Sequence, residues 1–218
     1  MKLDTHHLKI ITPCFCAGAS QDSAELRGTS VRGQLRWWFR SLGASADQEA
    51  RVFGSTKDDR PSAGLFAVRL IKTKDGSPWN PPRVDPNKSS AYVLYFASVS
   101  GDPKGVRWKS SGCLPPGTEF QLEIRWHRTP GPEDERMFGA AMDSFLRFGG
   151  LGLRVTRGLG GFTCTSLDHS DEKHSTALDL LISKGFTVRP RTGAGPWQTW
   201  EGAMQDWSAW VRYDLRKG

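Results

Sequence analysis

The chain has 218 residues and a formal net charge of +7, and 37% of its residues are hydrophobic. This composition excludes a disordered chain, and no apolar run approaches the roughly 18 residues that a membrane-spanning helix needs. The four unevenly spaced cysteines exclude a disulfide framework, and the polar N-terminus lacks the apolar segment of a signal peptide. We therefore expect a cytoplasmic globular protein whose basic charge favours an anionic partner.

The N-terminal part of the chain predicts a strand followed by a helix. Weak alternation predicts a strand over residues 2–11, which ends before Pro13, and the small and polar residues 14–28 predict a loop. Ser30 is expected to cap a helix that ends near Gly43. Apolar side chains recur at helical spacing along one side of this helix, at Val31, Leu35, Trp38, Phe39 and Leu42.

The middle of the chain predicts strands separated by irregular segments. A short helical turn is expected over residues 47–53 and a strand over 64–72. Five Pro and Gly residues make 73–90 an irregular insertion. A further strand is expected over 91–99, and strict alternation over 118–128 predicts the clearest strand of the chain.

The last third predicts a helix, a glycine-rich loop, a strand and two more helices. Pro132 and three acidic residues open a helix that stops at Gly149. A strand is expected over residues 161–167, and helices over 171–183 and 196–215. The final helix carries Trp197, Trp200, Trp207 and Trp210, which predict either packing on the core or a docking surface for a partner.

The order of these elements predicts an α+β fold. Strand, helix, two strands, helix and strand is the ferredoxin-like (RRM-like) βαββαβ plan, here with insertions and a C-terminal helical extension. We expect residues 1–170 to form this domain and residues 171–218 to form a helical extension packed on it. The fold alone does not define an activity.

Two clusters of arginine and glycine are candidates for binding phosphates. Arg32, Arg36 and Arg40 recur every four residues and form a basic stripe beside the apolar side of the predicted helix, either for RNA or as a solvated face. Residues 149–161 contain six glycines with Arg154 and Arg157, which predict a flexible main-chain surface with exposed amides, or an ordinary long loop.

Signals for metal binding and catalysis are weak. Cys14 and Cys16 form a lone Cys-x-Cys pair without the second pair that a zinc site needs. A ribonuclease could use His6, His7 or His127 as a general base, but lone histidines are more often structural. We expect no catalytic residue, no metal and no cofactor.

Residues 25–42 resemble the N-terminal signature of the RAMP proteins, the repeat-associated subunits of CRISPR effector complexes. The resemblance is nearest to the first RAMP subunit of the type III-B (Cmr) complex, in which the signature follows a strand ending in Thr-Pro, here Thr12-Pro13. Residues 52–55 are similar to the Phe-Gly-Ser element of that family. Residues 149–162 are similar to its glycine-rich loop, with Thr156 where an arginine is common.

The resemblance implies an RRM-like core and a non-catalytic subunit that binds guide RNA (crRNA) near its 3′ portion and the target RNA, assembled with other effector subunits and with no membrane. Relatives usually carry a second half, so we expect that half to be reduced to the helices after Asp171 or to be missing. The implied RNA contacts are Arg27, Arg32, Gly33, Arg36, Arg40, Arg154, Arg157, Gly158 and Gly160.

Two alternatives remain open at this point. The first is a RAMP-type endoribonuclease that processes guide RNA or cleaves target RNA. The second is an interaction module that binds no RNA, in which the tryptophan-rich tail docks a partner.

Overall fold

The computed structural model describes residues 2–16, 23–56, 61–77, 113–188, 199–200 and 202–206, and the backbone of two short segments at 98–99 and 107–108. None of the helices within these ranges is long and apolar enough to cross a membrane. The principal elements are β1 (Leu3–Ile10), β2 (Cys14–Phe15), α1 (Gly28–Ser41), α2 (Ala46–Phe53), β5 (Phe66–Lys74), β8 (Cys113–Leu114), β9 (Glu119–Trp126), α4 (Pro132–Phe148), the 3-10 turn η3 (Val155–Arg157), β10 (Phe162–Cys164) and α5 (Asp171–Ser183). Four further short strands are β3 (Gly54–Ser55), β4 (Ser62–Ala63), β6 (Ser98–Val99) and β7 (Arg107–Trp108), and β3 pairs with β4.

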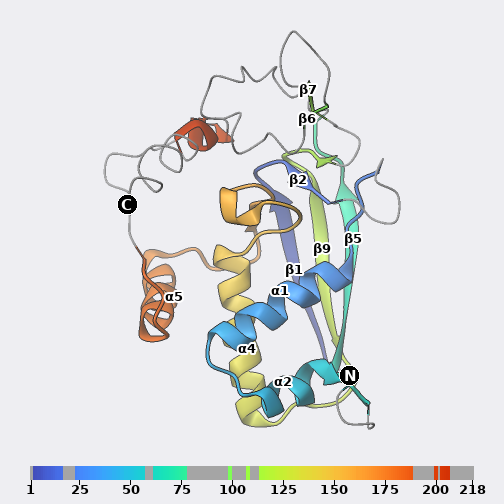
Figure 1. The fold of residues 1–218 in the computed structure, drawn as a ribbon, viewed down its shortest axis with the longest axis vertical. Coiled ribbons are helices and arrows are strands. Elements are labelled where there is room, and N and C mark those ends of the chain that lie inside the picture. Colours follow the sequence, from blue (N-terminus) through green and yellow to red (C-terminus); the bar gives the residue numbers. More distant parts are fainter. Residues whose placement is uncertain are drawn as a thin grey trace.

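A four-stranded sheet is the centre of the fold. Its strand order is β10-β1-β9-β5, and every neighbouring pair is antiparallel. In the chain, α1 lies between β1 and β5, and α4 lies between β9 and β10. Figure 1 shows α1, α2 and α4 in front of the sheet, so one sheet face is covered by helices. The expected combination of an antiparallel sheet with helices is confirmed.

The covered face holds the hydrophobic core. All five apolar residues predicted for the first helix are at most 6% exposed. They pack against the inward-facing residues of the sheet, among them Leu8, Phe120 and Leu122, each at most 1% exposed. Because side chains alternate along a strand, the neighbouring residues of β1 and β9 lie on the opposite face.

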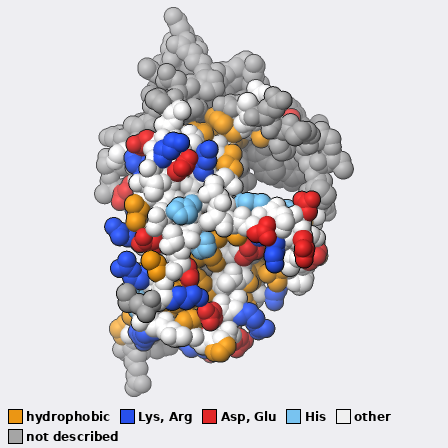
Figure 2. Space-filling view, turned by 180° about the vertical axis from the view of Figure 1, so that it is seen from behind, with side chains coloured by type: hydrophobic (Ala, Val, Ile, Leu, Met, Phe, Trp, Pro, Cys, Tyr) orange, Lys and Arg blue, Asp and Glu red, His pale blue; other side chains and the backbone are white. Residues whose placement is uncertain are grey.

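That opposite face is polar. On β1 and β9, which the structure describes in full, it carries one apolar residue, Leu3, and the polar residues Thr5, His7, Lys9, Glu119, Gln121, Glu123 and Arg125. Figure 2 shows the molecule from behind, with Lys and Arg side chains mixed with Asp and Glu. Glu123 is typical of this mixture, because it lies 4.0 Å from Arg69 and 3.9 Å from Arg125.

The first helix begins three residues earlier than expected. Arg27 is the N-cap, with φ −114° and ψ 128°, so the prediction of Ser30 as the cap is wrong. The cause lies in the tertiary structure: a Cβ atom on Gly28 would lie 2.5 Å from the carbonyl oxygen of Val68. This close approach of the helix to β5 depends on Gly28, which the local pattern treated as loop.

Three other segments differ from expectation or lie outside the described residues. The predicted loop at residues 14–28 contains β2, which pairs with β8. Of the strand expected over 91–99 only β6 is described, and it pairs with β7 instead of joining the main sheet. The helix expected over 196–215 is described only at residue 200 and at 202–206, which are helical; Trp197, Trp207 and Trp210 lie outside the described residues.

The last described helix of regular length, α5, packs on the helical side of the core. Its Leu181 is 4% exposed and belongs to the core cluster. After α5, the ring of Phe186 stacks on Trp38 with a centroid distance of 6.0 Å. His174 contacts Phe148 of α4 at 5.5 Å between ring centroids.

Candidate nucleic-acid interface

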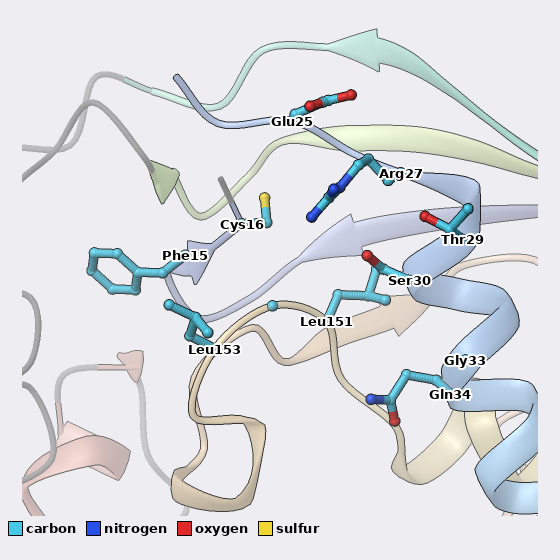
Figure 3. A pocket seen from close by; sticks show the side chains of 11 residues that line it. Phe15, Cys16, Glu25, Arg27, Thr29, Ser30, Gly33, Gln34, Leu151 and Leu153 are labelled. Atoms are coloured by element: carbon cyan, nitrogen blue, oxygen red, sulfur yellow. The ribbon is translucent and has the colours of Figure 1, made fainter. Parts of the chain in front are cut away.

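A cleft of about 400 Å³ lies between the start of α1 and the glycine-rich loop. Figure 3 shows the cleft, in which the start of α1 faces a loop that is more than a hundred residues away in the sequence. Residues from the α1 wall and from β2 and the loop line it: Glu25, Arg27, Thr29, Ser30, Gly33, Gln34, Phe15, Cys16, Leu151, Gly152 and Leu153. We call it the α1–loop cleft.

The N-terminus of α1 faces this cleft without a capping side chain. Arg27 makes no side-chain cap hydrogen bond, and the first turn carries no acidic residue. The first amides of a helix lack partners within the helix, and its dipole places partial positive charge at this end. Thr29 and Ser30 are exposed and add hydroxyl groups. The arrangement suits an anion such as a phosphate.

The fold does not require a glycine at position 33. It is exposed within α1, and a Cβ atom added to it would meet no atom within 4 Å. Glycine in a helix interior costs about 1 kcal/mol relative to alanine. Because Gly33 lines the α1–loop cleft, the missing side chain leaves room for a ligand backbone to approach the helix closely.

The glycine-rich loop is ordered by its own backbone geometry. Gly152, Gly158 and Gly160 have φ values of +86°, +80° and +65°. At Gly160 a Cβ atom would lie 1.7 Å from the carbonyl oxygen of Leu151, so no other residue fits there. Gly158 and Gly160, predicted as backbone support for RNA contacts, are therefore required first by the fold of the loop itself.

Residues after β1 anchor this loop. The hydroxyl of Thr12 donates to the carbonyl of Gly158 at 2.8 Å and accepts from the amide of Gly161 at 2.8 Å. The amide of Gly160 donates to Pro13, and that of Leu153 donates to Phe15. The prediction of exposed amides is therefore wrong at Leu153, Gly160 and Gly161, whose amides are bonded within the protein.

Arg27 supplies the positive charge of the cleft. Figure 3 shows its side chain directed across the cleft toward Cys16. The pKa of the Cys16 thiol is lowered, first by a hydrogen bond with Cys14 and further by the amide of Glu25 and the charge of Arg27. The same contact with Cys16, and then burial, raise the pKa of Cys14. The carboxylate of Glu25, which also lines the cleft, acts on the pKa of Cys16 in the opposite direction to Arg27.

Arg32 is held inside the protein and not on the cleft. Its guanidinium donates to the carbonyl oxygens of Phe66 at 2.8 Å and Phe53 at 2.7 Å. It also lies 4.5 Å from the ring centroid of Phe66. Burial, and then the charge of Arg36, lower its pKa.

Arg36 and Arg40 converge on a single carboxylate. Both donate to Glu49 of α2, which is 8% exposed. These contacts, with Arg40 first, lower the pKa of Glu49. The side chains of Arg36 and Arg40 remain 42% and 57% exposed. The stripe predicted from spacing therefore links α1 to α2 and β5, and its arginines do not line the α1–loop cleft.

Arg154 and Arg157 lie at the outer turn of the glycine-rich loop. Arg154 precedes η3 in the left-handed conformation, with φ 60°, and Arg157 ends it. The amide of Arg157 donates to the carbonyl of Arg154 at 2.8 Å. Neither residue is among those that line the cleft. Of the predicted site residues, the structure brings together Arg27 and Gly33, and it adds Gly152 and Leu153.

Nine of the eleven cleft residues were absent from the predicted RNA contacts, among them Thr29, Ser30, Gln34 and Leu153. Thr29, Ser30 and Gln34 fall inside the segment that resembles the RAMP signature, but Ser30 was expected only to cap the helix, and Thr29 and Gln34 were given no role. Their position on the same side of α1 as Gly33 could have been found from helical periodicity. Leu153 is 57% exposed, and no local pattern signals its place at the cleft.

The described ranges contain no group of three or more His, Cys, Asp or Glu side chains placed to bind a metal ion. His6 is partly buried, and this burial is the main cause of its lowered pKa. The backbone amide of His127 donates to Leu65, at the far end of β9 from the glycine-rich loop. Neither histidine lines the α1–loop cleft.

Comparison with known proteins identifies relatives in sequence. The chain is 29% identical over 170 residues to the CRISPR system Cmr subunit Cmr1-2 of Pyrococcus furiosus, covering 70% of this chain and 90% of that protein. It is 25% identical over 166 residues to subunit Cmr1-1 of the same organism, covering 72% of this chain and 43% of that protein.

Solved structures are similar in fold. The crystal structure of Cmr1 from Pyrococcus furiosus in its apo form matches with a TM-score of 0.64 and 18% identity, over 100% of this chain and 73% of that one. A chain of the type III-B Cmr-beta complex bound to cognate target RNA matches with a TM-score of 0.50 and 13% identity, over 84% of this chain and 62% of that one.

The family assignment rests on the part of the chain that contains both walls of the α1–loop cleft. Residues 7–163 match the RAMP superfamily, a range that begins within β1 and ends within β10. This range includes the sheet strands β5 and β9, helix α1 and the glycine-rich loop. The chain therefore belongs to the RAMP superfamily.

Proposed function

We propose that this protein is a guide-RNA-binding subunit of a type III-B CRISPR effector complex, located in the cytoplasm, and that it binds RNA without cleaving it. The α1–loop cleft holds the backbone of the RNA. Within the complex, the protein caps the assembly near the 3′ portion of the guide and the target RNA. Other effector subunits are its protein partners.

The fold supports this proposal. The strand order β10-β1-β9-β5, with α1 and α4 as the two crossover helices, supports a ferredoxin-like (RRM-like) plan. We infer that residues 1–170 form this domain and that residues 171–218 form a helical extension on it. The relatives named Cmr1-1 and Cmr1-2 belong to Cmr systems, which favours the same setting for this chain.

The single observation that carries the proposal is the meeting of two distant motifs at one cleft. The start of α1 brings uncapped amides, two hydroxyls, Arg27 and the unfilled space at Gly33. The loop brings Gly152 and Leu153 to the opposite wall. Phosphate recognition uses cationic groups and backbone amides of this kind, independent of sequence.

The position of the cleft also argues against the usual RRM mode. RRM domains stack bases on aromatic residues of the open sheet face. The open-face side chains of β1 and β9 include no Phe, Tyr or Trp. We therefore assign the RNA to the α1–loop cleft, at one end of the sheet.

Salt-dependent RNA binding tests the proposal. The full chain is titrated with fluorescent single-stranded RNA at several salt concentrations, as the native protein and as the variants Arg27→Gln and Arg125→Gln. Both variants remove one positive charge, but Arg125 lies on the mixed-charge sheet face. We expect Arg27→Gln to weaken binding and to lower the slope of log affinity against log salt by about one unit, while Arg125→Gln leaves the slope unchanged.

Equal effects of the two variants would contradict the α1–loop cleft as the binding site. Absence of salt-dependent RNA binding by the native chain, alone and in its complex, would overturn RNA binding altogether. Labelled RNA recovered as site-specific fragments after incubation would contradict the non-catalytic role.

A further inference from the structure

The strand β1 has a partner along its whole length on one side only. On that side, β9 pairs with residues from Leu3 to Lys9. On the other side, β10 pairs only with Leu8, Lys9 and Ile10. The first half of β1 is therefore an open edge of the sheet within the part of the chain that the structure describes.

The hydrogen bonds of β1 show which backbone groups face this open edge. Even-numbered residues point toward β9: the carbonyl of Lys2 accepts from Trp126 at 3.0 Å, and the amide of Ile10 donates to Thr118 at 2.9 Å. The odd-numbered His7 points the other way, since its carbonyl accepts from the amide of Thr165 at 2.8 Å. By this alternation, the N–H and C=O groups of Leu3 and Thr5 point toward the open edge.

A groove of about 500 Å³ lies along this edge, with β1 as one wall and α4 as the other. Its apolar lining comes from Phe138, Met142 and Leu146 of α4. Leu3, on the rim, is 51% exposed. An edge with four directed backbone groups beside an apolar wall fits an extended peptide, whose main chain can pair and whose alternate side chains can pack.

Gly139 gives this β1–α4 groove its width. It lies in the interior of α4, is exposed, and would present a Cβ atom to open space with no atom within 4 Å. As at Gly33, the fold does not require the glycine, which costs helix stability. Gly139 lines the groove, so any side chain there would narrow it.

The charges of the groove disfavour RNA. Its lining includes the carboxylates of Asp4, Glu135 and Asp143 and the single ammonium of Lys2. Lys2 pairs with Asp4 and Glu135, and the buried Arg147 pairs with Asp143, so the three carboxylates exceed the two cations by one charge. This acidic surplus on a chain of net charge +7 repels phosphates and attracts basic side chains.

We propose that the β1–α4 groove binds an extended segment of another protein, which adds a strand to β1 beside Leu3 and Thr5. The segment carries apolar side chains at alternate positions, facing α4, and lysine or arginine at its ends. The groove is separate from the α1–loop cleft, so this interaction is independent of the proposed RNA binding.

A synthetic peptide tests the groove directly. The probe is a short peptide of alternating valine and threonine with lysines at both ends; the comparison peptides carry terminal glutamates or a central proline. With the full chain we expect the lysine peptide to bind and to slow hydrogen exchange at the amides of Leu3 and Thr5. The glutamate peptide should bind about tenfold more weakly, and the proline peptide should not bind.

Paired glycine variants make the result specific. Gly139→Leu should abolish peptide binding and keep RNA binding, whereas Gly33→Leu should do the reverse. If Gly139→Leu disturbs folding, Gly139→Ala replaces it in the test. This variant should raise the melting temperature and still weaken binding of the peptide. The proposal would be overturned if the native chain did not bind the lysine peptide. It would also be overturned if Gly139→Ala, Gly139→Leu and the native chain all bound that peptide with the same affinity. A dimer of this chain that Gly139→Leu dissociates, or RNA crosslinked at Leu3–Thr5, would likewise overturn it.

Discussion

The guanidinium of Arg32 donates to the carbonyl oxygen of Phe66 at 2.8 Å while lying 4.5 Å from the centroid of the same residue's ring. A second hydrogen bond, to Phe53, fixes the other end of the planar group. Arg32 thus joins α1 to the end of α2 and the start of β5. Three elements are joined by one side chain whose spacing had predicted either an RNA-binding stripe or a solvated face.

The first prediction follows from this contact. Arg32→Met should destabilise the fold by about 2–4 kcal/mol, because two buried carbonyl groups lose their donor. Arg32→Lys should recover only part of the loss, since an ammonium cannot span both carbonyls as a planar fork. Urea unfolding measures the difference, with Arg125→Gln as the control that should unfold like the native chain, because its 3.9 Å surface ion pair with Glu123 contributes little to stability. Native-like stability of Arg32→Met would show that water replaces these contacts without cost.

A second prediction concerns pH. Hydrogen bonds from Arg40 and Arg36 lower the pKa of Glu49 below its ordinary value of 4.5. A carboxylate with a lowered pKa stabilises the fold above the ordinary value, and that contribution is lost as the pH falls through the lowered one. Glu49→Gln should therefore be less stable than the native chain at pH 7, and the difference should shrink below pH 4.5. Melting temperatures across this range check it; a constant difference would assign the effect to packing instead.

A third prediction uses Gly33. Gly33→Ala should stabilise the protein by about 1 kcal/mol, because alanine is the better helix former and its methyl group meets no atom. The same variant should bind RNA more weakly, since the methyl group enters the α1–loop cleft. Thermal unfolding and RNA titration measure the two effects on one preparation. Stabilisation with unchanged RNA affinity would remove Gly33 from the interface.

Local patterns predicted much of the fold. The apolar face of α1, from Val31 to Leu42, follows from helical periodicity, and all five of its predicted members are buried. Residues 171–183 form a helix with the expected bounds. Alternation of apolar and polar residues predicted β9, because its even-numbered side chains face the core and its odd-numbered side chains face the polar side of the sheet. Such signals are local, so they need no knowledge of distant segments.

The candidate site could be predicted only in part, because its geometry depends on long-range contacts. Arg27 and Gly33 were found through the resemblance of one segment. The partners that withdraw Arg32, Arg36 and Arg40 from the cleft are Glu49 and two backbone carbonyls on other elements. The spacing of residues within α1 does not encode those partners. The same arginine spacing is therefore expected whether the side chains face solvent, bind RNA or bond to other elements of the fold.

The last prediction concerns Thr12, whose hydroxyl holds both ends of the loop's final turn. It donates to Gly158 and accepts from the amide of Gly161, each at 2.8 Å. Thr12→Val keeps the shape but removes both bonds, at a cost of about 1–2 kcal/mol. Because these bonds lie in the loop and outside the core cluster, we expect the loss to appear as faster amide exchange at residues 151–161.

The consequence for RNA should be larger than that for global stability. Loosening the loop moves Gly152 and Leu153, which form one wall of the α1–loop cleft, so the RNA must restore their order when it binds. RNA affinity should fall in Thr12→Val, the melting temperature should fall by only a few degrees, and Thr12→Ser should restore both the exchange rates and the affinity. If Thr12→Val binds RNA like the native chain while its loop exchanges faster, then the order of the loop does not contribute to binding, and the α1 wall alone forms the site.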